Sequence, residues 1–243
     1  MSSTARSEAL FSHDDLPLPV QIRGVRGARR LRLRLDEKKG VLKLTGPLRM
    51  NRKAALEWAA EQREWVEAQI GAMLPAEPFC PGTMVPIEGC DVTLRWSESA
   101  RRIPQINGDV LLCGGPESGF ARRIEGFLKQ RARDILSRET AEAAERAGVT
   151  LKSVSVGDAD TRWGSCSSSG RIRYSWRLIL APPDARRYVV AHEVAHLVRM
   201  DHGPAFKALE RKLFSETFGG DVDAARLLLR RVGSRLKRIG RTR

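Results

Sequence analysis

The sequence predicts an α+β protein in which a β-rich N-terminal module, residues 16–115, precedes an α+β module, residues 116–243. Short segments that alternate apolar and polar residues dominate the first half, whereas longer segments with apolar residues at helical spacing dominate the second. A chain of 243 residues can form two modest domains, and Gly114-Gly115-Pro116 marks the expected boundary between them. Residues 1–15 are mostly polar and small, and we expect them to be disordered.

The N-terminal module is expected to start with strands and continue with a helix. Apolar residues alternate with polar ones between residues 19 and 44, and the Glu37-Lys38-Lys39-Gly40 turn separates two of the runs, which predicts a meander of short strands. Asn51 is expected to cap a helix over residues 52–73. In that helix, Trp58 and Trp65 occupy positions at which core residues are expected.

Further strands and a hairpin turn are expected before the predicted boundary. The Asn107-Gly108 pair is a strong signal for the turn. The strands themselves are expected at residues 84–87, 91–96 and 109–113.

The second module is expected to be mainly helical. A long helix should end at Gly148, and Pro182-Pro183-Asp184 should start another, with Asp184 as its N-cap. Besides the helix that starts at Asp184, helices are expected over residues 116–147, 204–218 and 221–239, and strands over 151–156 and 171–179.

Composition indicates a globular protein of the cytoplasm. Hydrophobic residues make up 42% of the chain and charged residues 30%, as in ordinary soluble domains. The four cysteines form no close pair of the kind that binds metal, and residues 1–15 show no apolar core of a signal peptide, so we expect free thiols in a reducing compartment. No stretch approaches the roughly 18 apolar residues of a membrane span, so no membrane association is predicted.

The chain is strongly basic, with a formal net charge of +14. Much of the excess lies in two segments, residues 23–34 and residues 226–243. Basic surfaces attract polyanions, so nucleic acid is a candidate partner, while a generally cationic surface is the simpler interpretation. Aromatic residues do not interleave with either segment, as a platform for stacking single-stranded bases would require.

The residues with the clearest chemistry are His192-Glu193-Val194-Ala195-His196. On a helix, positions i and i+4 lie about 40° apart around the axis and about 6 Å along it, so both histidines can bind one ion. Glu193 lies about 100° around the helix from His192, within reach of a water at that ion. We therefore predict one Zn²⁺ ion held by His192 and His196, with Glu193 as the general base.

A catalytic zinc site needs a third protein ligand, and His202 follows six residues after His196. The spacing equals that of metzincins, but Arg199 stands at their glycine position and no methionine follows Met200 to form their Met-turn. Glutamates of the next predicted helix, Glu210 and Glu216, are the alternative third ligands, and we favour His202 over them.

Residues upstream and downstream of this motif occur in a specific order. They are Arg162-Trp163-Gly164-Ser165-Cys166-Ser167, Arg171 to Ile179, Tyr188 to Glu193 and Asp201-His202-Gly203-Pro204-Ala205-Phe206. This order resembles the YgjP-like metallopeptidase family, which is related to SprT-like zincins and the DNA-crosslink proteases. The resemblance implies a zincin fold, a metal bound by His192, His196 and His202, and a catalytic Glu193. Lys207 departs from the family, whose members usually have tryptophan there, and we expect altered packing behind the site.

These observations predict a zinc metallopeptidase that hydrolyses peptide bonds of a peptide or protein substrate. The strand around residues 171–179 is expected to offer an edge to an extended peptide. The donor for the developing oxyanion stays open among Tyr174, Tyr188, Arg162 and Arg173. Two alternatives remain, a protease recruited to DNA through the basic segments and a zinc protein without catalysis. Trp163, Trp176 and Cys166 are interpreted as packing residues.

Overall fold

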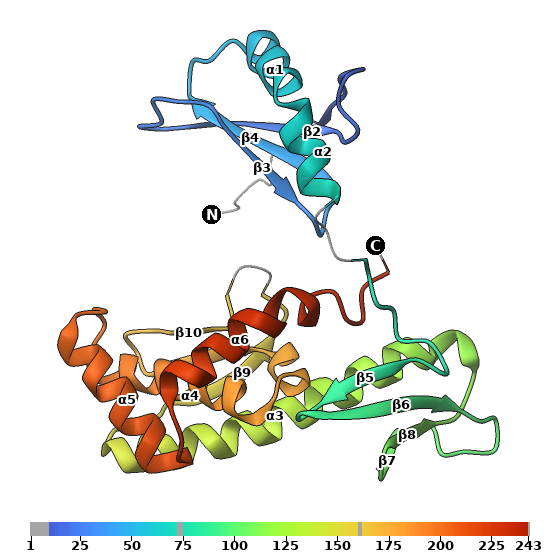
Figure 1. The fold of residues 1–243 in the computed structure, drawn as a ribbon, viewed down its shortest axis with the longest axis vertical. Helices are drawn as coiled ribbons and strands as arrows, with labels where there is room; N and C mark the ends of the chain where they lie inside the picture. Colours follow the sequence, from blue (N-terminus) through green and yellow to red (C-terminus); the bar gives the residue numbers. More distant parts are fainter. Residues whose placement is uncertain (1–9, 72–74, 160–161, 243) are drawn as a thin grey trace, which may run out of the picture. The chain divides into compact units, whose positions relative to one another are not determined.

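The computed structural model describes residues 10–71, 75–159 and 162–242, which fall into two compact units, Met1–Leu74 and Pro75–Arg243 (Figure 1). The division lies ahead of the expected boundary at residues 115–116, because the strands before that point share a core with the helix after it. Leu94 and Leu111 of those strands belong to the same buried cluster as Leu128 of the helix. The predicted α+β class is confirmed, since each unit contains both strands and helices.

The predicted disorder of residues 1–15 falls partly outside the described residues, which start at residue 10. In the described part, Leu10–Phe11 forms the short strand β1 and pairs with the next strand. Among the residues that the structure describes, no helix has both the length and the apolar character needed to cross a bilayer.

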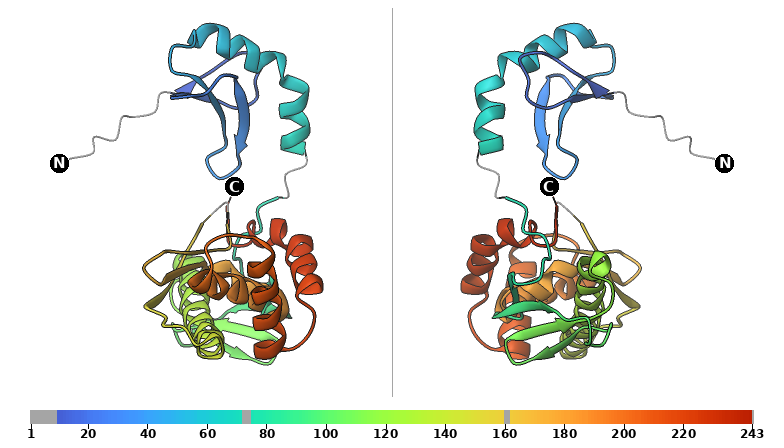
Figure 2. Two further views of the ribbon diagram at one scale, coloured as in Figure 1. Left: turned by 90° about the vertical axis from the view of Figure 1, so that its left-hand side faces the viewer. Right: turned by 90° about the vertical axis from the view of Figure 1, so that its right-hand side faces the viewer.

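The N-terminal unit is a sheet with two helices on one face (Figure 2). Its strands after β1 are β2 (Val20–Val25), β3 (Arg32–Asp36) and β4 (Val41–Pro47). The strand order is β1-β2-β4-β3, with β2 parallel and β3 antiparallel to β4. The predicted meander is therefore wrong, because β4 inserts between the two strands that precede it. Leu42 and Leu44 of β4 are fully buried on the face that packs against the helices.

The predicted helix over residues 52–73 is divided at Gln62 into α1 (Arg52–Glu61) and α2 (Arg63–Gly71). Asn51 caps α1 as predicted, since its side chain accepts hydrogen bonds from two backbone amides at the helix start. Trp58 is half-buried against the core of this unit. The core prediction is wrong for Trp65, which is 40% exposed, because the break at Gln62 leaves Val66 to face the core instead.

The C-terminal unit contains two sheets. The first has the order β5-β6-β8-β7 and the second the order β10-β11-β9. Their strands are β5 (Met84–Ile87), β6 (Cys90–Trp96), β7 (Gln105–Asn107), β8 (Val110–Cys113), β9 (Ser153–Gly157), β10 (Gly164–Cys166) and β11 (Arg171–Ser175). The predicted hairpin turn joins β7 to β8, with Gly108 at a φ of +61°. The strand predicted over residues 171–179 ends at Ser175, and the 3₁₀ helix η2 (Trp176–Leu180) follows it.

Helices of this unit pack against the second sheet (Figure 1). After a short 3₁₀ turn, η1 (Glu117–Gly119), the α-helices are α3 (Phe120–Ala147), α4 (Pro183–Val198), α5 (Pro204–Phe218) and α6 (Val222–Leu236). Gly148 ends α3 in the left-handed conformation, as predicted. The N-cap prediction for Asp184 is wrong, because Pro182 occupies the cap and Asp184 lies in the first turn. Since α4 packs against α3, α5, α6 and β10, its side chains reach the middle of the unit.

Candidate metal centre

Three histidines from α4 and the loop after it meet at one point. His192 and His196 lie one helical turn apart on α4, with ring centroids separated by 4.8 Å. The helix ends at Val198 and the chain turns back, so the ring of His202 lies 5.3 Å from that of His192 and 4.7 Å from that of His196. One nitrogen from each histidine falls within 4.8 Å of the others, and no other such cluster of metal-binding side chains occurs in the described part of the chain.

The hydrogen bonds of two of these rings orient their free nitrogens. Nδ1 of His192 lies 2.6 Å from Oε1 of Glu210, and Nδ1 of His196 lies 3.1 Å from the carbonyl oxygen of Arg199. Carboxylate and carbonyl oxygens accept hydrogen bonds, so each Nδ1 carries the hydrogen and each Nε2 keeps its lone pair. Nε2 of His192 lies 3.4 Å from Nε2 of His202. The rings thus present lone pairs to a shared position, as ligands of a metal ion do.

Phe206 supports the cluster from behind. This side chain is 1% exposed, and its ring centroid lies between 4.6 and 5.2 Å from those of all three histidines. Glu210, an alternative third ligand in the sequence analysis, is instead buried behind His192 as its hydrogen-bond acceptor. Glu216, the other alternative, is exposed on α5. The arrangement therefore favours His202 as the third ligand.

Glu193 lies on α4 beside the cluster, but its carboxyl group is enclosed. The residue is 5% exposed and faces Gly164 of β10. Burial raises the pKa of Glu193 to about 7, although the charges of His192 and Arg162 act in the opposite direction. A carboxyl group whose pKa lies near neutrality can both accept and return a proton under ordinary conditions.

Gly164 gives Glu193 its space. A Cβ atom at this position would lie 2.7 Å from Cγ of Glu193 and closer still to Oε1, far inside van der Waals contact. We expect Gly164→Ala to displace the carboxyl group and to lower the peptidase activity that the sequence predicts about 10- to 100-fold, with the fold retained. Turnover of a fluorescent casein substrate and circular dichroism measure the two effects. Gly126→Ala on α3 is the control, because nothing lies within 4 Å of its Cβ position; equal rates for the two variants would contradict the prediction.

A family model described as "YgjP-like, metallopeptidase domain" matches residues 29–217 and thus includes the histidine cluster, Glu193 and β10. The chain belongs to the YgjP-like family. No curated protein and no solved structure matches the chain. Residues 29–217, which include α4, therefore form a metallopeptidase domain, as the resemblance in the sequence implied.

In the tryptophan-glycine-serine-cysteine segment of this YgjP-like domain, Gly164–Cys166 form β10, which is antiparallel to β11, and Trp163 directly precedes the strand. The expectation that residues 171–179 offer an edge is wrong, because β11 pairs with β10 on one side and β9 on the other. Among the described residues, β10 and β9 each pair with β11 alone, so they are the two edge strands of this sheet, and β10 is the one that lies beside Glu193. It also packs against α4, which places the open edge near the metal centre.

The candidate oxyanion donors of the YgjP-like domain differ in position. Tyr174 is buried, and its hydroxyl lies 3.1 Å from Oγ1 of Thr140, away from solvent. Arg173 packs on the backbone of β9 at Gly157. Tyr188 is half-buried, with its ring centroid 6.1 Å from that of His192. Arg162 is exposed, and its positive charge lowers the pKa of Glu193. Tyr188 and Arg162 therefore stay candidates, whereas Tyr174 does not.

Trp163, Trp176 and Cys166 were predicted to be packing residues, and each packs in the core of the C-terminal unit. Trp176 is fully buried, and Trp163 packs on Gly233 of α6. Burial and the nearby Glu193 raise the pKa of the Cys166 thiol, as is usual for a cysteine that serves packing. Lys207, the departure from the family, is exposed on α5, so its side chain does not enter the packing behind the site.

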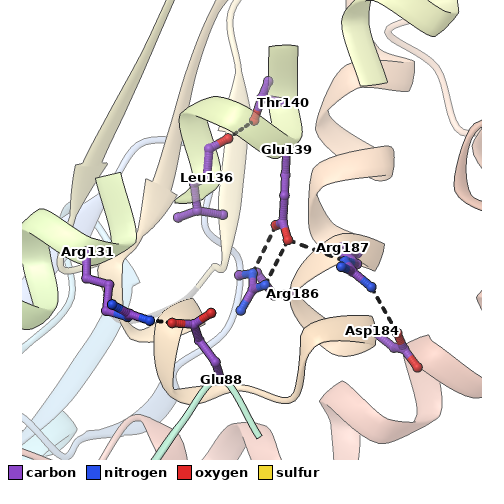
Figure 3. A network of polar contacts seen from close by, with 8 residues as sticks. All are labelled: Glu88, Arg131, Leu136, Glu139, Thr140, Asp184, Arg186 and Arg187. Carbon is purple, nitrogen blue, oxygen red and sulfur yellow. Dashed lines mark hydrogen bonds and ion pairs between the residues drawn. The ribbon is translucent and has the colours of Figure 1, made fainter. Parts of the chain in front are cut away.

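Sequence reasoning missed the ion pairs that fix α4 against α3 (Figure 3). Glu139 of α3 accepts hydrogen bonds from Nε and Nη2 of Arg186 at 2.9 and 2.7 Å, and from Nε of Arg187 at 3.3 Å. The side chains of Glu139 and Arg186 are 5% and 3% exposed. The partners lie 47 residues apart on different helices, so no local pattern could reveal them. Arg186 lies two turns before Glu193 on the same side of α4, so the pair fixes the face of α4 that carries Glu193.

Proposed function

We propose that this metallopeptidase is a zinc enzyme in which His192, His196 and His202 hold one Zn²⁺ ion and Glu193 is the general base. The observation that carries the proposal is the orientation of the two helix histidines. Their Nδ1 atoms are bonded to Glu210 and to the carbonyl of Arg199, which leaves both Nε2 atoms available, and Nε2 of His192 lies 3.4 Å from Nε2 of His202. Three imidazole ligands with an open fourth position are characteristic of catalytic zinc.

A bound ion of this kind lowers the pKa of water and polarises the carbonyl of the scissile peptide bond. Glu193 accepts the proton of the attacking water and then delivers it to the nitrogen of the leaving amine. Its enclosure under Gly164 supports this role, because the carboxyl group is held in one place and shielded from bulk solvent. Tyr188 and Arg162 are the side chains that we assign as candidate donors to the oxyanion.

The open edge of β10 supports a protein or peptide as the substrate. An extended peptide can add to a free strand edge through main-chain hydrogen bonds, which do not depend on its sequence. Because β10 packs against α4, a peptide bound there would pass close to Glu193 and the histidines. We therefore propose unfolded or extended polypeptide as the class of substrate.

His202→Ala tests the metal site directly. We expect the wild-type protein to bind one equivalent of Zn²⁺ and to cleave fluorescent casein, and the variant to lose both the stoichiometric metal and the activity. Mass spectrometry of the native protein and a casein assay with added Zn²⁺ provide the measurements. His13→Ala is the matched control, since this histidine lies in the other unit and contacts Glu57.

Other outcomes would change the assignment. If His202→Ala retained stoichiometric zinc, the third ligand would move to Glu210 or Glu216. If wild-type protein bound zinc but cleaved neither casein nor short peptides, the catalytic proposal would fail and a non-catalytic zinc protein would remain.

A further inference from the structure

One face of the sheet in the N-terminal unit carries arginines in place of apolar residues. Side chains alternate along a strand, so the residues next to the buried Leu42 and Leu44 point to the opposite face. On that face Thr45 of β4 lies between Arg23 of β2 and Arg32 of β3. In the neighbouring row, Lys43 lies between Gln21 and Arg34.

The loop between β2 and β3 extends this basic face. It contributes Arg26, Arg29 and Arg30, which line an open hollow of about 610 Å³ together with Arg32 and Thr45. We call the set Arg23, Arg26, Arg29, Arg30, Arg32 and Arg34 the arginine face. The hollow gives it a concave centre, with cationic groups around a threonine hydroxyl.

The charges of the arginine face have no acidic partner among residues 10–71, 75–159 and 162–242. None of its six arginines forms an ion pair or a side-chain hydrogen bond with another residue of the described part of the chain. Asp36 of β3 lies on the same face, but its carboxylate forms an ion pair at 2.6 Å with Lys43. Clustered like charges destabilise a fold, so a surface of this kind indicates an anionic partner that supplies the missing charge.

The chemistry of the face selects one kind of anion. The planar guanidinium group donates paired hydrogen bonds that match the oxygens of a phosphate, which favours arginine at phosphodiester sites. No phenylalanine, tyrosine or tryptophan occurs between residues 12 and 57, so the arginine face lacks the aromatic platform on which single-strand binders stack bases. A flat lipid surface would not reach the bottom of a hollow, whereas the projecting backbone of a duplex can enter it.

We propose that the arginine face binds the sugar–phosphate backbone of duplex nucleic acid without reading its sequence. Arg23 and Arg32 hold phosphates on either side of Thr45, and the loop arginines surround the backbone at the hollow. The site lies in the N-terminal unit, separate from the metal centre, and the proposal does not depend on peptidase activity.

The test measures binding of the full chain to 20-base-pair DNA and RNA duplexes and to a single strand of equal length by fluorescence anisotropy. Wild-type protein should bind both duplexes more tightly than the single strand. The double variant Arg23→Gln/Arg32→Gln should weaken duplex binding at least tenfold at about 0.1 M salt. It should also reduce the slope of log K against log salt concentration by about 2, as expected for two lost phosphate contacts. Casein cleavage should be unchanged.

A matched control separates this site from general charge. Arg122→Gln/Arg133→Gln removes the same charge from exposed positions of α3 and should bind as wild type does. The proposal is overturned if both double variants lose affinity equally, or if Arg230→Gln/Arg231→Gln on α6 is the only one that does. Tighter binding to phosphatidylserine vesicles or to polyglutamate than to duplexes would also overturn it.

Discussion

Glu193→Gln is expected to lower the rate of peptide hydrolysis by a factor of about 10²–10⁴, the usual contribution of general acid–base catalysis. Glutamine has nearly the same size and fits the enclosed position under Gly164, but its amide cannot accept a proton from water. The histidines and their partners Glu210 and Arg199 are untouched, so the zinc content should stay at the wild-type level.

The rate should be measured with fluorescent casein under single-turnover conditions, and metal by mass spectrometry on the same preparation. Glu216→Gln is the control, because this glutamate is exposed on α5 and should leave both readings unchanged. If Glu193→Gln cleaved casein at the wild-type rate, Glu193 could not be the general base. Loss of zinc together with activity would show that Glu193 maintains the metal site instead.

The residues of the metal centre were predictable because their arrangement is mostly local. Helical geometry alone places His192 and His196 on one side of α4, and the short loop to His202 leaves little freedom. The same is true of the Asn51 cap, the Gly148 helix end and the turn at Asn107-Gly108, each decided by a few neighbouring residues.

Features that depend on distant residues were not predictable from local patterns. Alternation identified β2, β3 and β4, but the insertion of β4 between the other two depends on pairing across the sheet. For the same reason, the strand that was expected to be an edge, β11, is the central strand of its sheet, and β10 is at an edge. The boundary at residues 74–75 follows from the shared core of β6, β8 and α3, which the composition of the strands alone does not reveal.

The tautomers of the histidines in the metal centre also depend on residues that are distant in the sequence. Glu210 was a candidate ligand from sequence, and only the packing of α5 against α4 places its carboxylate on Nδ1 of His192. The metal centre therefore requires a fixed position of α4 relative to both α5 and α3. Phe206 and Glu210 supply the contact with α5, and the Glu139–Arg186 ion pair supplies the contact with α3.

Breaking that ion pair should strongly destabilise the contact between α3 and α4. Glu139→Leu leaves the guanidinium group of Arg186 buried and without its carboxylate, which costs about 3–5 kcal/mol in the free energy of unfolding. Arg186→Met should lower the free energy of unfolding by less, but it leaves Glu139 with only the longer hydrogen bond from Arg187. Urea denaturation followed by circular dichroism measures these changes.

The double variant Glu139→Leu/Arg186→Met distinguishes stability from positioning. Replacing both charges with apolar side chains removes the cost of burying them, and Nη1 of Arg186 already lacks a hydrogen-bond partner, so most of the lost stability should return. If the ion pair also positions α4, casein cleavage at saturating zinc should stay below the wild-type rate even though the protein is folded. If both the free energy of unfolding and the rate of casein cleavage recovered fully, the ion pair would have no positioning role, and apolar packing would serve equally well at the α3–α4 contact. An unchanged urea midpoint in Glu139→Leu would contradict its structural role altogether.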